Sequence, residues 1–187
     1  MENAANWPIS QTFCFRKAKG LYYFRALILN FLKKRMVTRI LIFAVLNFGA
    51  LYLGSVFTTP GVDSNWYETL NKAPWTPPGW VFGFAWTTIM VCFSVFMAKL
   101  YVLEEDKTQI LILFAIQWVL NIAWNPTFFY FKQLELAVVV ILSLTVIVAL
   151  FLLLYQKKMG AYSLLILPYL IWLIIADSLS IYSSLKN

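Results

Sequence analysis

Five stretches of this chain are long and apolar enough to cross a lipid bilayer. They cover residues 40–57, 79–98, 110–131, 136–155 and 161–182; none contains Lys or Arg, and Asp177 is the one acidic residue in them. A helix needs about 20 mainly apolar residues to cross a hydrocarbon core of about 30 Å. The alternation typical of barrel strands is absent, and helices satisfy their own backbone polar groups in lipid. The sequence therefore predicts an all-α membrane protein, a five-transmembrane-helix bundle.

The composition places the chain outside the soluble class. Of its 187 residues, 61% are hydrophobic and 12% are charged, and the mean hydropathy is +0.75. A soluble domain has about 45–50% apolar and about 25% charged residues. The five stretches with short connections use nearly the whole length, so we expect one transmembrane domain over residues 36–187.

Basic residues predict the orientation. Of the 15 Lys and Arg residues, 12 precede the first stretch or lie between stretches two and three or four and five. Cytoplasmic segments carry the excess of positive charge, so the N-terminus is expected to be cytoplasmic. Without targeting signals of a eukaryotic type, we expect a bacterial inner membrane.

Residues 1–35 form a basic N-terminal extension ahead of the first stretch. The segment is polar to amphipathic and could be an interfacial helix on an anionic leaflet or a targeting or added segment. Met36 stands just before the first stretch and would be a natural start. We expect the extension to be dispensable for function.

The residue types present exclude several kinds of site. Cys14 and Cys92 are the only two cysteines, and they lie in different environments. With no histidine in the chain, a histidine-ligated haem or a zinc site is not expected, and the prediction is no metal and no required cofactor. Paired carboxylates, phosphate-binding Gly-rich loops and Ser/His/Asp sets are also missing. The positive charge follows the topology and does not predict a nucleic-acid-binding face.

Aromatic residues and a polar stripe are the candidate functional features. The chain has 8 Trp, 10 Tyr and 16 Phe. Trp86 is about 12 Å into the second stretch, and Trp118, Trp124 and Trp172 also lie deep. Buried indole N–H groups seek partners, so these residues either face lipid as bulk or line a bundle interior or ligand pocket.

Gln117, Asn121 and Asn125 recur every four residues and share one helix face. Such residues can join helices or contact a ligand, and Asn121 is the better candidate for a ligand. Asp177 is an intramembrane carboxylate, hence a functional candidate, although it could also reach the interface near Lys186.

The loop over residues 58–78 holds four of the seven prolines and several aromatic residues. It is expected to be either a rigid lid over a cavity between the helices or an ordered connector. Pro126 and Pro168 are expected to kink the third and fifth helices.

Three motifs make the chain resemble the TspO/MBR family of tryptophan-rich sensory proteins and translocator proteins. The first is Pro60-Gly61, Trp66-Tyr67, Leu70 and Lys72 followed by WTPPGWVFGFAWT at 75–87; the second is QWVLNIAWNPTFF at 117–129; the third is PYLIWLIIADSL at 168–179. The resemblance covers about residues 37–187. It implies a five-helix fold, usually dimeric, with a cavity on the side of the 58–78 loop.

The resemblance also implies ligands and site residues. Family members bind porphyrins, notably protoporphyrin IX, as well as cholesterol and synthetic isoquinoline- or benzodiazepine-type ligands. By position, the family's pocket maps onto seven residues: Tyr67, Trp86, Met90, Asn121, Trp124, Trp172 and Ala176. The expected function is thus a membrane receptor or carrier for porphyrins and other lipophilic molecules, with a role in tetrapyrrole regulation or stress response.

Two other functions stay open, and the chain departs from the family at two positions. It could degrade porphyrin in light, with Trp86 and Trp172 as the catalytic residues, or act as a regulatory scaffold. Ser180 and Asp177 replace an asparagine and a neutral residue that are common in the family. Residues 179–186 match a loose sterol-contact pattern, so a sterol is a further possible partner.

Overall fold

The computed structural model describes the backbone from Ile9 to Asn187 and the side chains from Lys33 onward. Every regular element in this range is helical, which confirms the predicted fold class. The elements are α1 (Ile9–Val62), α2 (Asn65–Thr69), α3 (Gly79–Leu103), α4 (Lys107–Asn125), the π-helical turn η1 (Pro126–Tyr130), α5 (Leu134–Met159), the 3-10 segment η2 (Gly160–Ile166) and α6 (Leu167–Lys186).

Four apolar helical segments are long enough to cross a membrane: Lys33–Val62, Gly79–Leu103, Lys107–Tyr130 and Leu134–Lys186. The last has 53 residues, about 80 Å as one helix and far beyond a core of about 30 Å. It turns back at η2, where Gly160 takes a φ of 53°, and α5 then packs along α6. The protein therefore crosses the membrane five times, with α5 and α6 as separate crossings.

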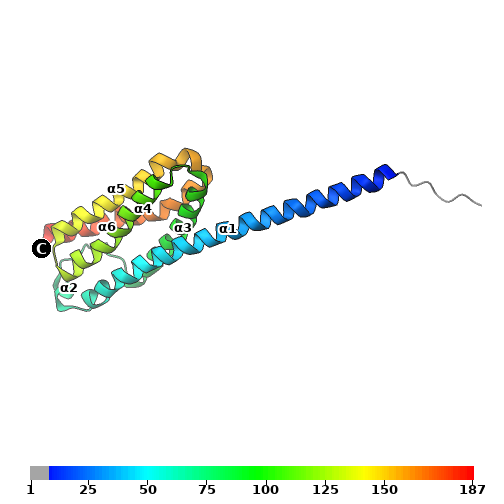
Figure 1. Ribbon diagram of the computed structural model, residues 1–187. Coiled ribbons are helices and arrows are strands. Elements are labelled where there is room, and N and C mark those ends of the chain that lie inside the picture. Colours follow the sequence, from blue (N-terminus) through cyan, green and yellow to red (C-terminus); the bar gives the residue numbers. More distant parts are fainter. Residues whose placement is uncertain (1–8) are drawn as a thin grey trace, which may run out of the picture. The chain divides into compact units, whose positions relative to one another are not determined.

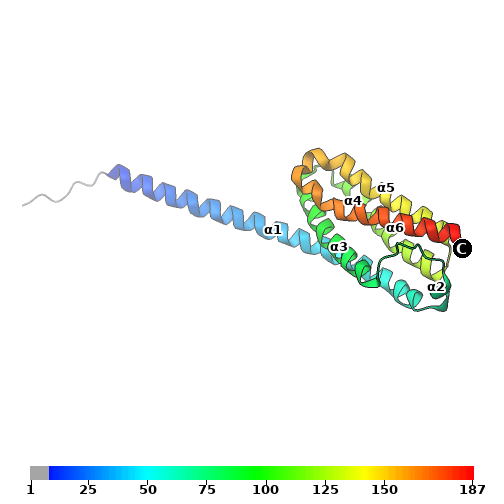
Figure 2. The same ribbon diagram turned by 180° about the vertical axis from the view of Figure 1, so that it is seen from behind.

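The helices of residues 40–187 close into a ring in the order α1, α3, α6, α5, α4. The contacts of α3 with α6, α6 with α5 and α5 with α4 form most of it. Hydrogen bonds attach α1 to both neighbours. Asn47 Nδ2 donates to Ser94 Oγ in α3 at 2.9 Å, Trp118 Nε1 in α4 donates to the Leu46 carbonyl at 2.9 Å, and Thr58 Oγ1 donates to Asn125 Oδ1 in α4 at 2.7 Å. Figures 1 and 2 show α2 and the C-terminus at one end of the bundle and the turn between α5 and α6 at the other.

Residues 1–39 and 40–187 form two separate compact units. The boundary expected at residue 36 stays a prediction. Residues 1–8 and the side chain of Cys14 lie outside the described part of the chain, and dispensability of the extension stays a prediction. Cys92, in α3, is a free cysteine.

The loop expected at 58–78 is shorter than predicted and partly helical. α1 continues to Val62 with Pro60 in its last turn, and α2 forms within the connection. Ser64 caps α2, because its Oγ accepts the Tyr67 backbone N–H at 3.3 Å. A proline usually ends a helix at the preceding residue, whereas α1 continues two residues beyond Pro60, so the predicted boundary was wrong. We call residues 63–78 the lid segment.

Pro126 and Pro168 both mark changes in helix type. Pro126 begins η1, where the backbone widens to π-helical bonding, and the Phe131 N–H donates to the Pro126 carbonyl at 2.9 Å. Pro168 is in the first turn of α6, directly after η2. It therefore starts a helix, where its missing N–H costs nothing, and does not kink one. The fifth predicted stretch is thus divided into η2 and α6.

Aromatic rings fill the centre of the bundle. The Phe93 ring, fully buried in α3, lies 5.4 Å from Tyr169 of α6, 5.7 Å from Phe151 of α5 and 6.2 Å from Phe114 of α4. Lipid tails are as apolar as these side chains, so close packing rather than water exclusion holds the helices together. Edge-to-face ring pairs add about 0.5–1.5 kcal/mol each.

Candidate ligand-binding site

Tyr169 joins three of the helices that carry predicted site residues. Its side chain in α6 is fully buried, and its hydroxyl accepts a hydrogen bond from Gln117 Nε2 of α4 at 2.8 Å. Its ring lies edge-on to Trp86 of α3, with centroids 6.0 Å apart. Met90, one turn beyond Trp86, is 1% exposed and faces the same interior. The structure thus brings Trp86 of α3 against the same α6 residue that binds Gln117 of α4.

The polar stripe of α4 divides into two structural residues and one without a partner. Gln117 binds Tyr169, and Asn125 Oδ1 accepts the Thr58 hydroxyl of α1 at 2.7 Å while its amide donates to the Asn121 carbonyl at 3.0 Å. The Asn121 side chain is 6% exposed and makes no hydrogen bond within the described residues. Asn121 therefore keeps its hydrogen-bonding capacity for another molecule.

Trp172 and Ala176 form the α6 side of the predicted site. Trp172 is 6% exposed and packs edge-on against Phe82 of α3, with ring centroids 5.2 Å apart. Its indole Nε1 is buried and has no acceptor among the described residues. Ala176 is one turn further along and also buried. A buried N–H without an acceptor is costly unless a ligand or water supplies one.

Tyr67 and Trp124 belong to a second aromatic cluster, which joins the lid segment to α4 and η1. The Phe129 ring of η1 lies 5.7 Å from Tyr67 and 5.9 Å from Trp124, and the Trp124 ring stacks on Phe128 at 5.2 Å. Trp124 Nε1, like that of Trp172, is buried without an acceptor in the part of the chain described. The π-helical turn positions these rings, because its wider register places Phe128 and Phe129 together on the inner side.

Tyr67 is a hydrogen-bond donor at neutral pH. Desolvation by burial raises the pKa of the Tyr67 phenol above its ordinary value. The Lys72 ammonium lies 4.2 Å from the centre of its ring, in cation–π contact. Burial thus keeps Tyr67 a neutral phenol at neutral pH, while the Lys72 ammonium packs on the face of its ring.

The lid segment is attached to the C-terminal end of α6. Trp75 Nε1 donates to Ser178 Oγ at 3.1 Å, and its ring packs on Tyr182 with centroids 5.3 Å apart. Asn71 donates its backbone N–H to Asn187 Oδ1 at 2.9 Å and its amide to the Lys186 carbonyl at 3.1 Å. The segment is therefore an ordered cover over this end of α6.

Asp177 contacts α5. It does not approach Lys186, which was the alternative expected from the sequence. Asp177 Oδ2 lies 2.8 Å from Thr145 Oγ1 of α5, and its side chain is 8% exposed. The position is one residue past Ala176, a rotation of about 100° on a helix, which turns the side chain toward α5.

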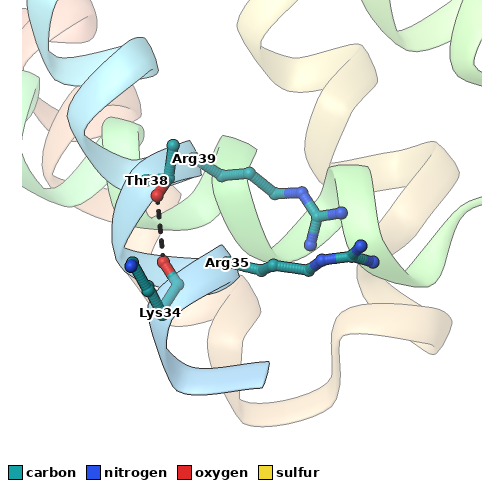
Figure 3. A pocket seen from close by; sticks show the side chains of 4 residues that line it. All are labelled: Lys34, Arg35, Thr38 and Arg39. Carbon is teal, nitrogen blue, oxygen red and sulfur yellow. Dashed lines mark hydrogen bonds between the residues drawn. The ribbon is translucent and has the colours of Figure 1, made fainter. Parts of the chain in front are cut away.

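A hollow on α1 is formed by residues that are not among the predicted site residues (Figure 3). It is lined by Lys34, Arg35, Thr38 and Arg39, and the Thr38 hydroxyl donates to the Lys34 carbonyl at 3.0 Å. The arginine side chains extend in the same direction from one face of the helix. Its chemistry is cationic, as expected at the start of a crossing on the positively charged side.

Comparison with known proteins decides the family. The model of the TspO/MBR family matches residues 41–185. The chain belongs to the TspO/MBR family. The tryptophan-rich protein TspO of Chlorobaculum tepidum is 33% identical over 132 residues, covering 69% of this chain and 83% of the relative. TspO of Archaeoglobus fulgidus is 34% identical over 150 residues, covering 78% and 94%. The translocator protein of Bos taurus is 30% identical, covering 69% and 78%.

The TspO/MBR match confirms the resemblance inferred from the three motifs. All seven predicted site residues lie within the matched range, and the basic extension precedes it. Together with the apolar helices, membership makes this a multi-pass membrane protein. Sequence reasoning missed Tyr169 and Phe129 as organising residues, although both stand in the quoted motifs. An aromatic residue directly after Pro168 and another in the Pro126 turn were the signals available.

Proposed function

We propose that this TspO/MBR protein is a membrane receptor or carrier for porphyrins, protoporphyrin IX above all, and for other lipophilic ligands such as sterols. The site comprises Tyr67, Trp86, Met90, Asn121, Trp124, Trp172 and Ala176. The physiological setting that we infer is tetrapyrrole regulation or a stress response. The proposal includes a homodimer in a bacterial inner membrane with a cytoplasmic N-terminus.

The observation that carries the proposal is the set of polar groups left without partners in the bundle. Trp124 Nε1 and Trp172 Nε1 are buried donors with no acceptor in the described chain, and the buried Asn121 amide is uncommitted. A ligand with acceptor atoms would satisfy all three. A porphyrin has carboxylate oxygens for such donors and a flat face for the indole and phenol rings. It would be held through its macrocycle and substituents, since the chain has no histidine for an axial bond.

Titration of the purified full-length protein with protoporphyrin IX tests the proposal. We expect saturable quenching of tryptophan fluorescence with micromolar or tighter affinity, weakened about tenfold or more in Trp172→Phe, which keeps an aromatic ring but removes the N–H. The matched control is Trp80→Phe, because Trp80 is 73% exposed and outside the site. Absence of saturable quenching would contradict binding of protoporphyrin IX.

Illumination of the same complex in the presence of dioxygen separates a receptor from a degrading activity. Light-driven degradation would use dioxygen as the oxidant and Trp86 and Trp172 as the residues next to the photoexcited ring. It predicts loss of porphyrin absorbance that stops in Trp86→Phe. Stable absorbance with normal binding supports a receptor or carrier. A purely regulatory scaffold predicts neither binding nor loss.

A further inference from the structure

Asp177 is a carboxyl group inside the membrane-spanning part of α6 with no charged partner. It is 8% exposed, and its Oδ1 atom is buried without a hydrogen bond in the described chain. The neighbouring oxygen, Oδ2, has one contact, with Thr145 Oγ1 of α5 at 2.8 Å. An ionised carboxylate in a low-dielectric interior requires a cation or several donors, and a single hydroxyl does not meet that requirement.

Counting hydrogens at Thr145 indicates which atom donates. Thr145 Oγ1 lies 3.0 Å from the Ile141 carbonyl one turn earlier in α5, as well as 2.8 Å from Asp177 Oδ2. A threonine hydroxyl has one hydrogen and two acceptor lone pairs. If Asp177 carries a proton on Oδ2, that proton goes to Thr145 Oγ1, and the Thr145 hydrogen goes to the Ile141 carbonyl. Both short distances are then hydrogen bonds, and no charge is buried.

The charged residues of the elements packed against α6 lie far from Asp177. On α5, Glu135 is ten residues from Thr145, about 15 Å, and Lys157 is twelve residues away on the other side, about 18 Å. On α3, Lys99 is seventeen residues, about 25 Å, beyond Phe82, whose ring meets Trp172. On α6 itself, Lys186 is nine residues away, about 13 Å.

The remaining titratable groups on these elements and on the lid segment either contact another residue or lie far from Asp177. Lys72 lies over the Tyr67 ring, Tyr182 packs on Trp75 and Tyr169 accepts from Gln117. The others are Asp63 and Glu68 of the lid segment, which are acidic, and five groups at the far end of the helices or on α3: Cys92, Tyr101, Tyr155, Lys158 and Tyr162. No neighbouring cation in the described chain therefore offsets a negative charge on Asp177.

We propose that Asp177 and Thr145 form a proton-binding site between α5 and α6, with Asp177 protonated at neutral pH and donating to Thr145 Oγ1. This inference is independent of the proposed ligand, because the hydrogen-bond partner of Asp177, Thr145 of α5, is not a predicted site residue. The bound proton makes the α5–α6 contact a neutral hydrogen bond. Loss of the proton would leave an unpaired charge in that contact.

Infrared spectroscopy of the full-length protein in a detergent without ester or carboxyl groups tests the proposal directly. A protonated carboxyl group absorbs as a C=O stretch that carboxylates lack. We expect one such band at neutral pH, lost in Asp177→Asn and kept in Glu105→Gln, since Glu105 is exposed. Thr145→Val should keep the band but shift its frequency, because the carboxyl hydrogen loses its acceptor.

The wild-type spectrum alone can overturn the proposal. A neutral-pH spectrum without a carboxylic-acid band would show that Asp177 is ionised, whatever the variants do. A band that persists unchanged in folded Asp177→Asn would assign the proton to another group and contradict the proposal equally. We also expect Asp177→Asn to unfold within a few degrees of the wild type, since an amide can donate to Thr145 in the same geometry. Porphyrin affinity should be unchanged in this variant.

Discussion

At the scale of single residues, the hydrogen bond between Gln117 and Tyr169 links α4 to α6 beside the proposed site. Removing the Tyr169 hydroxyl in Tyr169→Phe leaves the Gln117 amide without its acceptor, and Gln117 Oε1 already lacks a partner among the described residues. We expect a loss of about 1–3 kcal/mol in stability, measured by denaturant or thermal unfolding in detergent. The double variant Gln117→Leu, Tyr169→Phe should recover most of that loss, because it removes both polar groups. A double variant no more stable than the single one would contradict this account.

Residue types at helical spacing made part of this site predictable. Gln117, Asn121 and Asn125 were expected on one face, but their spacing could not reveal that two of them have protein partners and that Asn121 does not. Those partners, Tyr169 and Thr58, are 52 and 67 residues away in the chain. Their positions follow from packing of whole helices, which a local pattern does not contain.

At the scale of the elements, the end of α1 depends on the absence of a side chain at Gly61. A Cβ atom there would lie 2.5 Å from Phe129 Cβ in η1, an atom fixed to the backbone. Gly61→Ala should therefore displace η1 and destabilise the protein by about 1–3 kcal/mol. Gly49→Ala in the same helix is the control, because a Cβ at that position meets nothing within 4 Å. Equal unfolding temperatures for the two variants would refute the close approach.

The elements also show where sequence patterns lose precision. The start of α3 at Gly79 agrees with the predicted stretch, since Pro78 cannot continue a preceding helix into it. The type of turn at Pro126 was not predictable: a proline signals a break in bonding, yet π-helical and kinked α-helical continuations have the same sequence signature. Contacts of Phe128 and Phe129 with α2 and Trp124 decide between them.

At the scale of the whole molecule, one ion pair fastens the connections at the end opposite the lid segment. Glu104 follows α3, and its carboxylate accepts from Lys158 Nζ at 2.7 and 2.8 Å. The Lys158 hydrogen bond holds the pKa of the Glu104 carboxyl below its ordinary value, against the effect of burial. Backbone N–H groups of Glu105 and Asp106 also lower this pKa.

A lowered pKa in the folded protein means stability that is present above the ordinary glutamate pKa and lost as pH falls through the lowered one. The unfolding temperature of the wild type should therefore fall as the pH is lowered through this range. Glu104→Gln should have a lower unfolding temperature than the wild type at neutral pH, and its unfolding temperature should fall less on acidification. Glu105→Gln should behave like the wild type, because Glu105 is exposed. Parallel curves for Glu104→Gln and the wild type would exclude the ion pair as a source of stability.

The division of the chain into residues 1–39 and 40–187 has a direct consequence for function. The predicted site residues and the family match at 41–185 lie in the second unit. Its closing contacts, such as Asn47 with Ser94 and Thr58 with Asn125, lie there as well. A chain that begins at Met36 keeps them all and loses seven of the eight basic residues ahead of the first crossing. We therefore expect this shortened chain to have the unfolding temperature and the protoporphyrin IX affinity of the full-length protein. Its binding to anionic vesicles should be weaker, because each Lys or Arg near such a surface contributes about 1 kcal/mol. Affinity lowered tenfold in the shortened chain, at equal unfolding temperature, would instead assign residues 1–35 a direct part in ligand binding.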